Sequence, residues 1–108
     1  MIEVIDDFFP RRLVQEGFYY LDSYNDWDHL ADSPENAHAY TLGKAFEYPN
    51  FEPVADKFFK LLDIEARKCL YNCFRHSDCP KAHVDSNVDQ GVTYIIYLNL
   101  DWNINMGG

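Results

Sequence analysis

The stretch from Gly91 to Asn99 constrains the fold most, because it is rich in the β-branched and aromatic residues that favour strands. His83 and Asp85 precede it, with one residue between them. Side chains on an extended segment alternate between its two faces, so these two are expected on the same side. An imidazole and a carboxylate are two of the three ligands in the 2-His-1-carboxylate sites that hold non-heme Fe(II). The pair is therefore a candidate metal-binding pair.

The length and composition predict one domain with a buried core. The chain has 108 residues, of which 47% are hydrophobic and 17% aromatic, well outside the composition of disordered chains. A domain of this size buries somewhat more than about 60% of its unfolded surface. We therefore expect residues 1–108 to form a single domain.

The charge balance argues against two classes of partner. The chain carries 18 acidic and 9 basic residues, a formal net charge of -9, so a phosphate backbone or an anionic membrane would meet net repulsion. No apolar run approaches the roughly 20 residues of a membrane span, and the first residues lack the pattern of a signal peptide. We expect a cytoplasmic protein that binds neither nucleic acid nor membranes.

The spacing of apolar residues predicts an α+β fold. Helical spacing at i, i+3, i+4 and i+7 follows Pro53 and stops at Asp63, and similar spacing leads up to Leu21 from an acidic first turn that holds Pro10. A long polar loop is expected from residue 22 to residue 36. The predicted strands are residues 2–5, 37–47, 66–75 and 91–99.

Several motifs together resemble the Fe(II)/2-oxoglutarate-dependent oxygenases of the prolyl 4-hydroxylase-like group. They are Val4-Ile5-Asp6-Asp7-Phe8-Phe9, Tyr71-Asn72, His83-x-Asp85, Tyr97-Leu98-Asn99-x-x-Trp102 and Gly107-Gly108. The resemblance implies a partial double-stranded β-helix (jelly roll) with two helices packed on one sheet.

The resemblance also implies a site. His83 and Asp85 match the family's first two iron ligands, and Tyr97 matches a strand tyrosine that contacts the 2-oxoglutarate carboxylate. Ile95 and Thr93 would share the face of Tyr97, and Tyr71 is a candidate for lining the same pocket. Fe(II) and 2-oxoglutarate are the implied cofactors, and hydroxylation of an unidentified peptide or small molecule is the implied reaction.

In this family the second histidine ligand and an arginine that pairs with the co-substrate come from strands after the double glycine, which here is Gly107-Gly108. We therefore expect the chain to represent the N-terminal half of the fold and to be inactive alone. Its sheets would have uncovered faces and unpaired edges, which favour pairing with another chain. A homo-oligomer, most simply a dimer, is the expected assembly.

Two other functions remain open. One is a noncatalytic, self-associating module that retains half of the fold. The other is a zinc site made from Cys73, His76, Cys79 and His83, although this spacing differs from that of zinc ribbons and fingers. The three cysteines are an odd number clustered in one region, so we expect them to be reduced.

Overall fold

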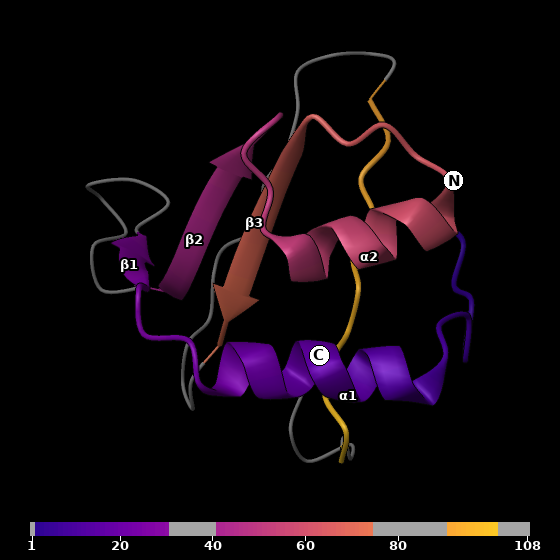
Figure 1. Ribbon diagram of the computed structural model, residues 1–108, viewed down its shortest axis with the longest axis horizontal. Coiled ribbons are helices and arrows are strands. Elements are labelled where there is room, and N and C mark those ends of the chain that lie inside the picture. Colours follow the sequence, from indigo (N-terminus) through magenta and orange to yellow (C-terminus); the bar gives the residue numbers. More distant parts are fainter. Residues whose placement is uncertain (1, 31–40, 75–90, 102–108) are drawn as a thin grey trace.

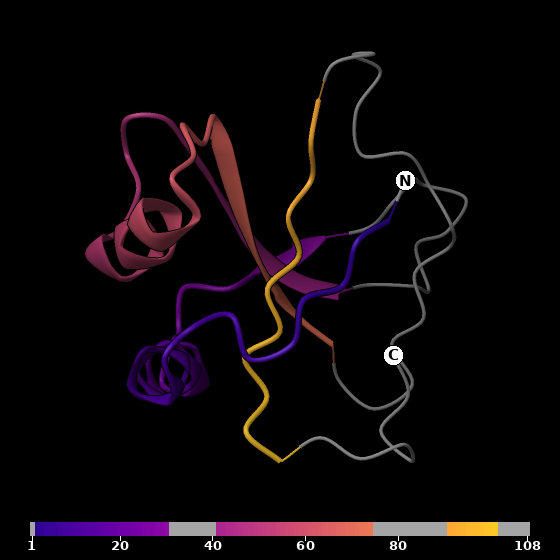
Figure 2. The ribbon, with the colours of Figure 1, turned by 90° about the vertical axis from the view of Figure 1, so that its right-hand side faces the viewer.

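The computed structural model describes residues 2–30, 41–74 and 91–101 (Figure 1). Its elements, in chain order, are α1 (Arg11–Asp22), β1 (Asp28–Leu30), β2 (Thr41–Glu47), α2 (Pro53–Leu62) and β3 (Lys68–Cys73). Both helices lie on the same side of the sheet, as the two views together show (Figures 1 and 2). The predicted α+β class is confirmed, and the described sheet is antiparallel.

Helix α2 forms where its sequence predicts. Pro53 occupies the first turn, where its missing N–H costs nothing. The helix ends at Asp63, which adopts the left-handed conformation with φ of 52°. The amide of Asp63 donates to the carbonyl of Lys60, and the amide of Ile64 donates to the carbonyl of Phe59. This is the Schellman pattern that satisfies the last carbonyls of a helix.

Helix α1 differs from its prediction at the N-terminal end. It begins at Arg11 after Pro10, and its first turn holds no acidic residue. The carbonyl of Pro10 accepts hydrogen bonds from the amides of Leu13 and Val14, at 2.9 and 3.2 Å. Asp6 and Asp7, which the sequence analysis expected in the first turn, lie before the helix. Asp7 has a positive φ of 54°, which breaks helical geometry.

The predicted strand at residues 2–5 is wrong. These residues have no regular secondary structure, and Ile2 and Val4 are exposed. An apolar run becomes a strand only when another strand satisfies its backbone groups. Among the residues that the structure describes, none pairs with this segment.

The sheet has the order β1-β2-β3, and both pairings are antiparallel. The sequence analysis expected a loop at residues 28–30, and this prediction is wrong because these residues form strand β1. Its polar residues gave no alternating signal, and it forms because it pairs with β2. Between β2 and β3 the register places Lys44 opposite Tyr71 and Gly43 opposite Asn72. Of the predicted strand 37–47, residues 37–40 lie outside the described part.

The strand predicted at residues 91–99 is also wrong, because these residues form no strand pairing with the rest of the described chain. They run past the β3 side of the sheet in both views (Figures 1 and 2). Burial nevertheless alternates along the segment: Ile96, Leu98 and Leu100 are half-buried, whereas Ile95, Tyr97 and Asn99 are exposed. Such alternation is typical of extended backbone with one covered face.

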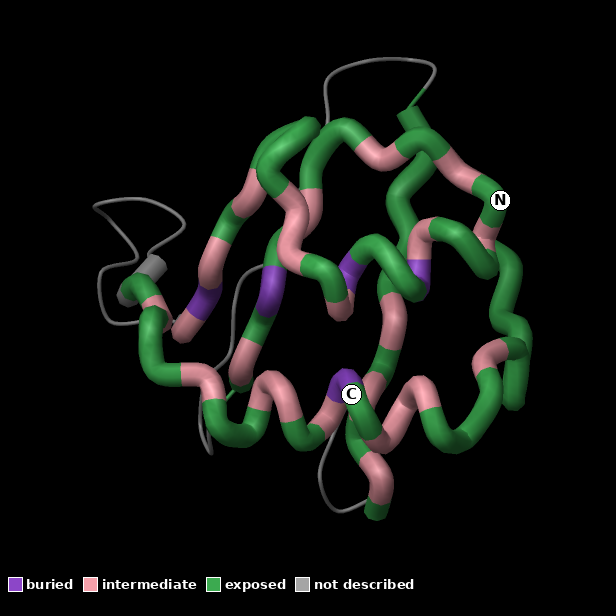
Figure 3. The backbone as a smooth tube through the Cα atoms, viewed as in Figure 1, coloured by how far each residue is buried: buried purple, intermediate pink, exposed green. Residues whose placement is uncertain are grey.

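The core lies between the helices and the sheet (Figure 3). Among the described residues, its buried hydrophobic side chains are Ala55, Phe58 and Tyr71. Gly17 of α1 permits a close approach, because a Cβ there would lie 3.1 Å from both Leu98 Cδ1 and the Phe58 ring. The absence of a side chain at residue 17 therefore lets α1 pack directly on α2 and on residues 91–101.

Within residues 2–30, 41–74 and 91–101, no helix has the length and apolar character needed to cross a membrane.

Phe58 should be the most costly side chain to truncate. It is 5% exposed and its ring centroid lies 4.9 Å from that of Phe9. Phe58→Ala should lower the free energy of unfolding by about 3–5 kcal/mol, through lost burial and the cavity left behind. Urea denaturation followed by circular dichroism measures this loss. Phe8→Ala, at a position 47% exposed, is the matched control and should cost much less.

Candidate functional site

Tyr71 lies on the face of β3 that packs against the helices. It is 7% exposed, and its ring contacts one aromatic side chain of α1, one of the following loop and one of β2. The ring centroids lie 6.4 Å from Tyr20, 5.6 Å from Tyr24 and 5.0 Å from Phe46. Trp27 extends this aromatic cluster through Tyr24, at 5.0 Å. The candidate co-substrate residue is therefore enclosed by packed rings.

A carboxylate lies at the edge of this cluster. Glu52 immediately precedes α2, and its Oε2 accepts a hydrogen bond from the hydroxyl of Tyr20. Its other oxygen, Oε1, and the hydroxyl of Tyr71 are both buried without a hydrogen-bond partner in the part of the chain that the structure describes. Buried polar atoms normally have a partner. The cluster thus holds one acceptor and one donor available to each other or to a bridging water.

The three tyrosines of the cluster are held in their neutral form. The hydrogen bond to Glu52, burial and the carboxylate charge together raise the pKa of Tyr20 to about 12. Burial, followed by the charge of Glu52, raises the pKa of Tyr71 and of Tyr24 above the ordinary value. These phenols are neutral hydrogen-bond donors near neutral pH.

The cation nearest the cluster already has carboxylate partners. Lys44 is the cross-strand neighbour of Tyr71, and its ammonium lies 3.1 Å from Asp26 Oδ2 and 3.6 Å from Asp28 Oδ2. These carboxylates raise the pKa of Lys44. Within the described part of the chain, the ammonium beside Tyr71 is therefore already paired with carboxylates.

Tyr97, the predicted contact for the co-substrate, lies on the side of the segment 91–101 that faces away from the helices. Its neighbour Leu98 faces the helices, because Leu98 Cδ1 lies 3.1 Å from where a Cβ on Gly17 would be. Tyr97 is 74% exposed, as expected if successive side chains of this extended segment point in opposite directions. Tyr97 thus points away from the helices. The structure does not bring Tyr97 and Tyr71 together.

The proposed metal ligands His83 and Asp85 lie outside the described residues. The same holds for His76 and Cys79 of the alternative zinc site, whose remaining ligand Cys73 is a half-buried free thiol on β3. Within the described ranges, no group of three or more histidine, cysteine, aspartate or glutamate side chains is placed to hold a metal ion.

Cys69 is a poor nucleophile at neutral pH. It is a free thiol on β3, and burial, followed by the charges of Glu52 and Asp56, raises its pKa to about 11. The thiolate is the reactive and metal-binding form. Cys69 is therefore a packing residue at neutral pH.

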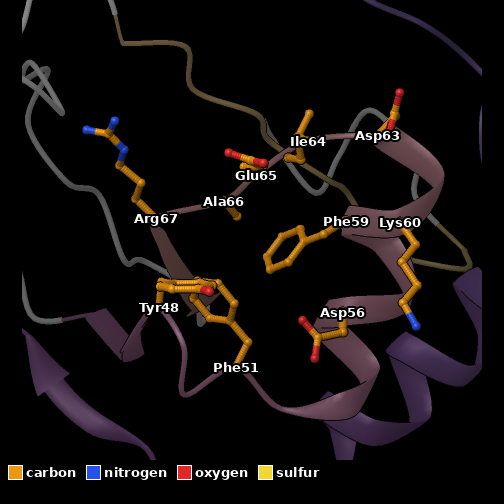
Figure 4. A pocket seen from close by; sticks show the side chains of 10 residues that line it. All are labelled: Tyr48, Phe51, Asp56, Phe59, Lys60, Asp63, Ile64, Glu65, Ala66 and Arg67. Atoms are coloured by element: carbon orange, nitrogen blue, oxygen red, sulfur yellow. The ribbon is translucent and has the colours of Figure 1, made fainter.

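The described part of the chain also has an open cavity of about 910 Å³ between α2 and the start of β3 (Figure 4). Three rings line it, those of Tyr48, Phe51 and Phe59, with centroid distances of 6.3 Å between the first two and 5.2 Å between the last two. Neither Tyr71 nor Tyr97 lines it. Among the described residues, the two predicted co-substrate contacts therefore lie outside this cavity.

Searches against protein-family models, the curated proteins and the solved structures found no match for this chain.

The sequence analysis missed Glu52 and Tyr20. They lie 32 residues apart, so no local spacing links them. The only local signal was the position of Glu52 beside Pro53, where an acidic residue favours a helix N-terminus. Their pairing depends on how α1 and α2 pack, which sequence spacing does not encode.

The raised pKa of Tyr20 predicts a pH dependence of stability. In the unfolded chain this phenol ionises near 10, whereas in the folded protein it stays neutral to about 12. The folded state binds the proton more tightly, so its stability advantage is present below pH 10 and is lost as the pH rises toward 12. Urea unfolding across this range measures the loss.

Tyr20→Phe should flatten this part of the pH profile, because it removes the ionising group but keeps the ring. Tyr19→Phe, at a position 62% exposed, is the control and should leave the profile unchanged. Equal profiles for wild type and Tyr20→Phe would contradict the assigned hydrogen bond.

Cys69 should react slowly with alkylating reagents. Its pKa of about 11 against an ordinary 9.0 implies about a hundredfold lower thiolate fraction near pH 8. In a variant with Cys73→Ser and Cys79→Ser, iodoacetamide labelling of the folded protein should be slower than labelling in urea by about this factor. Equal rates would show that Cys69 is not buried.

Proposed function

We propose that this chain forms part of a jelly-roll oxygenase domain dependent on Fe(II) and 2-oxoglutarate, with His83 and Asp85 as metal ligands and Tyr97 as a contact for the co-substrate. The proposal rests on the sequence resemblance. The structural observation that supports it is the direction of Tyr97. Tyr97 lies on the side away from the packed helices and is 74% exposed, so its hydroxyl can reach a ligand.

The arrangement of layers agrees with this proposal. A jelly roll has two sheets facing each other, and here α1 and α2 cover only one face of the sheet (Figure 2). The other face carries exposed side chains, among them Leu70 at 43%. A second sheet would cover this face, and the proposed metal and co-substrate would lie between the two sheets.

The chemistry divides between the cofactors and the chain. Bound Fe(II) and 2-oxoglutarate would supply the oxidising power for hydroxylation. His83 and Asp85 would hold the metal from one face of an extended segment. Tyr97 would donate its phenolic proton in a hydrogen bond to a co-substrate carboxylate and orient it. The role predicted for Tyr71 in this pocket stays a prediction. The substrate is proposed only as a peptide or small molecule.

A spectroscopic titration tests the proposal. Under anaerobic conditions, the protein with Fe(II) should develop a visible absorbance band when 2-oxoglutarate is added, because the co-substrate binds the metal directly. His83→Ala should abolish the band by removing a ligand. His29→Ala, which changes a histidine outside the proposed ligand set, is the control and should keep it. Absence of the band at every protein concentration would refute the proposal.

A second proposal concerns assembly. Several large apolar side chains are exposed in the described residues: Ile2 at 93%, Val4 at 80%, Val92 at 75% and Ile95 at 71%. Exposed apolar patches favour association. We expect the chain to self-associate, either as part of the proposed enzyme or as a noncatalytic module. Sedimentation showing a stable monomer at micromolar concentration would refute self-association.

A further inference from the structure

We propose that the cavity between α2 and the start of β3 binds an arginine side chain of a basic peptide segment. The cavity has a volume of about 910 Å³, and both aromatic rings and carboxylates line it. Such binding is independent of the function proposed above, because it requires neither Fe(II) nor 2-oxoglutarate.

Three aromatic rings line the cavity (Figure 4). The ring of Phe51 is central, with its centroid 6.3 Å from that of Tyr48 and 5.2 Å from that of Phe59. The rings of these two pairs are inclined at 63° and 72°, so their faces turn in different directions. Tyr48 is 72% exposed, so a ligand can reach its ring. A guanidinium group stacks on such faces, because the ring quadrupole attracts a cation.

A carboxylate stands beside these rings. The Asp56 carboxylate points toward the rings, whereas the charged ends of Lys60 and Arg67 point away from them (Figure 4). Within the described part of the chain, none of these three side chains forms an ion pair. The Asp56 carboxylate can therefore accept the two parallel hydrogen bonds that a guanidinium donates.

Backbone hydrogen bonds hold the lining residues in place. The amide of Tyr48 donates to the carbonyl of Arg67 at 2.9 Å, which joins the chain after β2 to the chain before β3. Phe59 belongs to α2, and its carbonyl accepts a hydrogen bond from the amide of Ile64 at 3.3 Å. A site whose backbone is already fixed loses little conformational freedom when it binds a ligand.

The size and charge of the cavity favour a basic peptide. Ligand pockets have volumes of about 300–1,000 Å³, so a cavity of about 910 Å³ has room for an arginine side chain and its neighbours in an extended segment. The chain has a net charge of -9, which attracts basic segments and repels acidic ones. In the cavity itself, three carboxylates outnumber two cationic groups; these side chains are Asp56, Asp63, Glu65, Lys60 and Arg67.

Titration with two matched peptides tests the proposal. The first is an acetylated and amidated pentapeptide with one arginine between two pairs of glycines. In the second, citrulline replaces the arginine, which removes the charge and keeps the length. Backbone amide chemical shifts, followed by NMR, give the Kd of each peptide. The citrulline peptide should bind at least about fivefold more weakly, because it loses the cation–π contact and the ion pair.

Variants of the chain separate a built site from general attraction to its net charge. Tyr48→Leu keeps an apolar side chain but removes the ring, and should raise the Kd of the arginine peptide about two- to fivefold. Tyr19→Leu, at a position 62% exposed outside the cavity, is the control and should leave the Kd unchanged. Asp56→Asn should also raise the Kd about two- to fivefold. Asp22→Asn removes the same charge at an exposed position outside the cavity and should not.

Three results would overturn the proposal. Equal Kd values for the two peptides would show that the cavity does not select a cation. Equal effects of Asp56→Asn and Asp22→Asn, with no effect of Tyr48→Leu, would show only general electrostatic attraction. Unchanged chemical shifts at millimolar peptide would show that the cavity does not bind this side chain. Circular dichroism verifies that each variant is folded. Any of these results leaves the proposed oxygenase function standing, because the titration contains no Fe(II) and no 2-oxoglutarate.

Discussion

The packing of both helices on one face of a three-stranded sheet determines the rest of this structure. Phe58 of α2 and Gly17 of α1 meet at the contact with Leu98, and the ring of Tyr71 in β3 lies 6.4 Å from that of Tyr20 in α1. Because this face is covered, every side chain that alternates onto it becomes part of the core. On β3, the side chains of the other face, Lys68, Leu70 and Asn72, are exposed. The two faces therefore have separate roles.

The covered face also contains polar groups, which gather in one cluster. Tyr20, Tyr71 and Glu52 come from three different elements and place their oxygens together in a buried location. Burial favours neutral phenols, and the hydrogen bond from Tyr20 to Glu52 links α1 to the residue that precedes α2. This structural role accounts for Tyr71 without any ligand. The role in the co-substrate pocket that the resemblance implies for Tyr71 stays a prediction.

The sequence predicted those elements whose signals are local. Pro53 and Asp63 bound α2 because a proline suits the first turn and a left-handed residue ends the last one. The composition of residues 66–75 predicted a strand, and β3 (Lys68–Cys73) lies within this range. The failures have one physical cause: residues 2–5 and 91–99 have strand-like composition, but a strand also needs a hydrogen-bonding neighbour. Conversely, β1 forms although its sequence has no strand signal, because β2 pairs with it.

Sequence alone determined the α+β class, the amphipathic helices, the strong negative charge and the motif that places His83 two residues before Asp85. These follow from composition, local spacing and backbone preference. Only the tertiary structure decided that Tyr71 is buried under the helices whereas Tyr97 is exposed. Alternation along a strand tells which residues share a face, but which face becomes covered depends on where the helices pack.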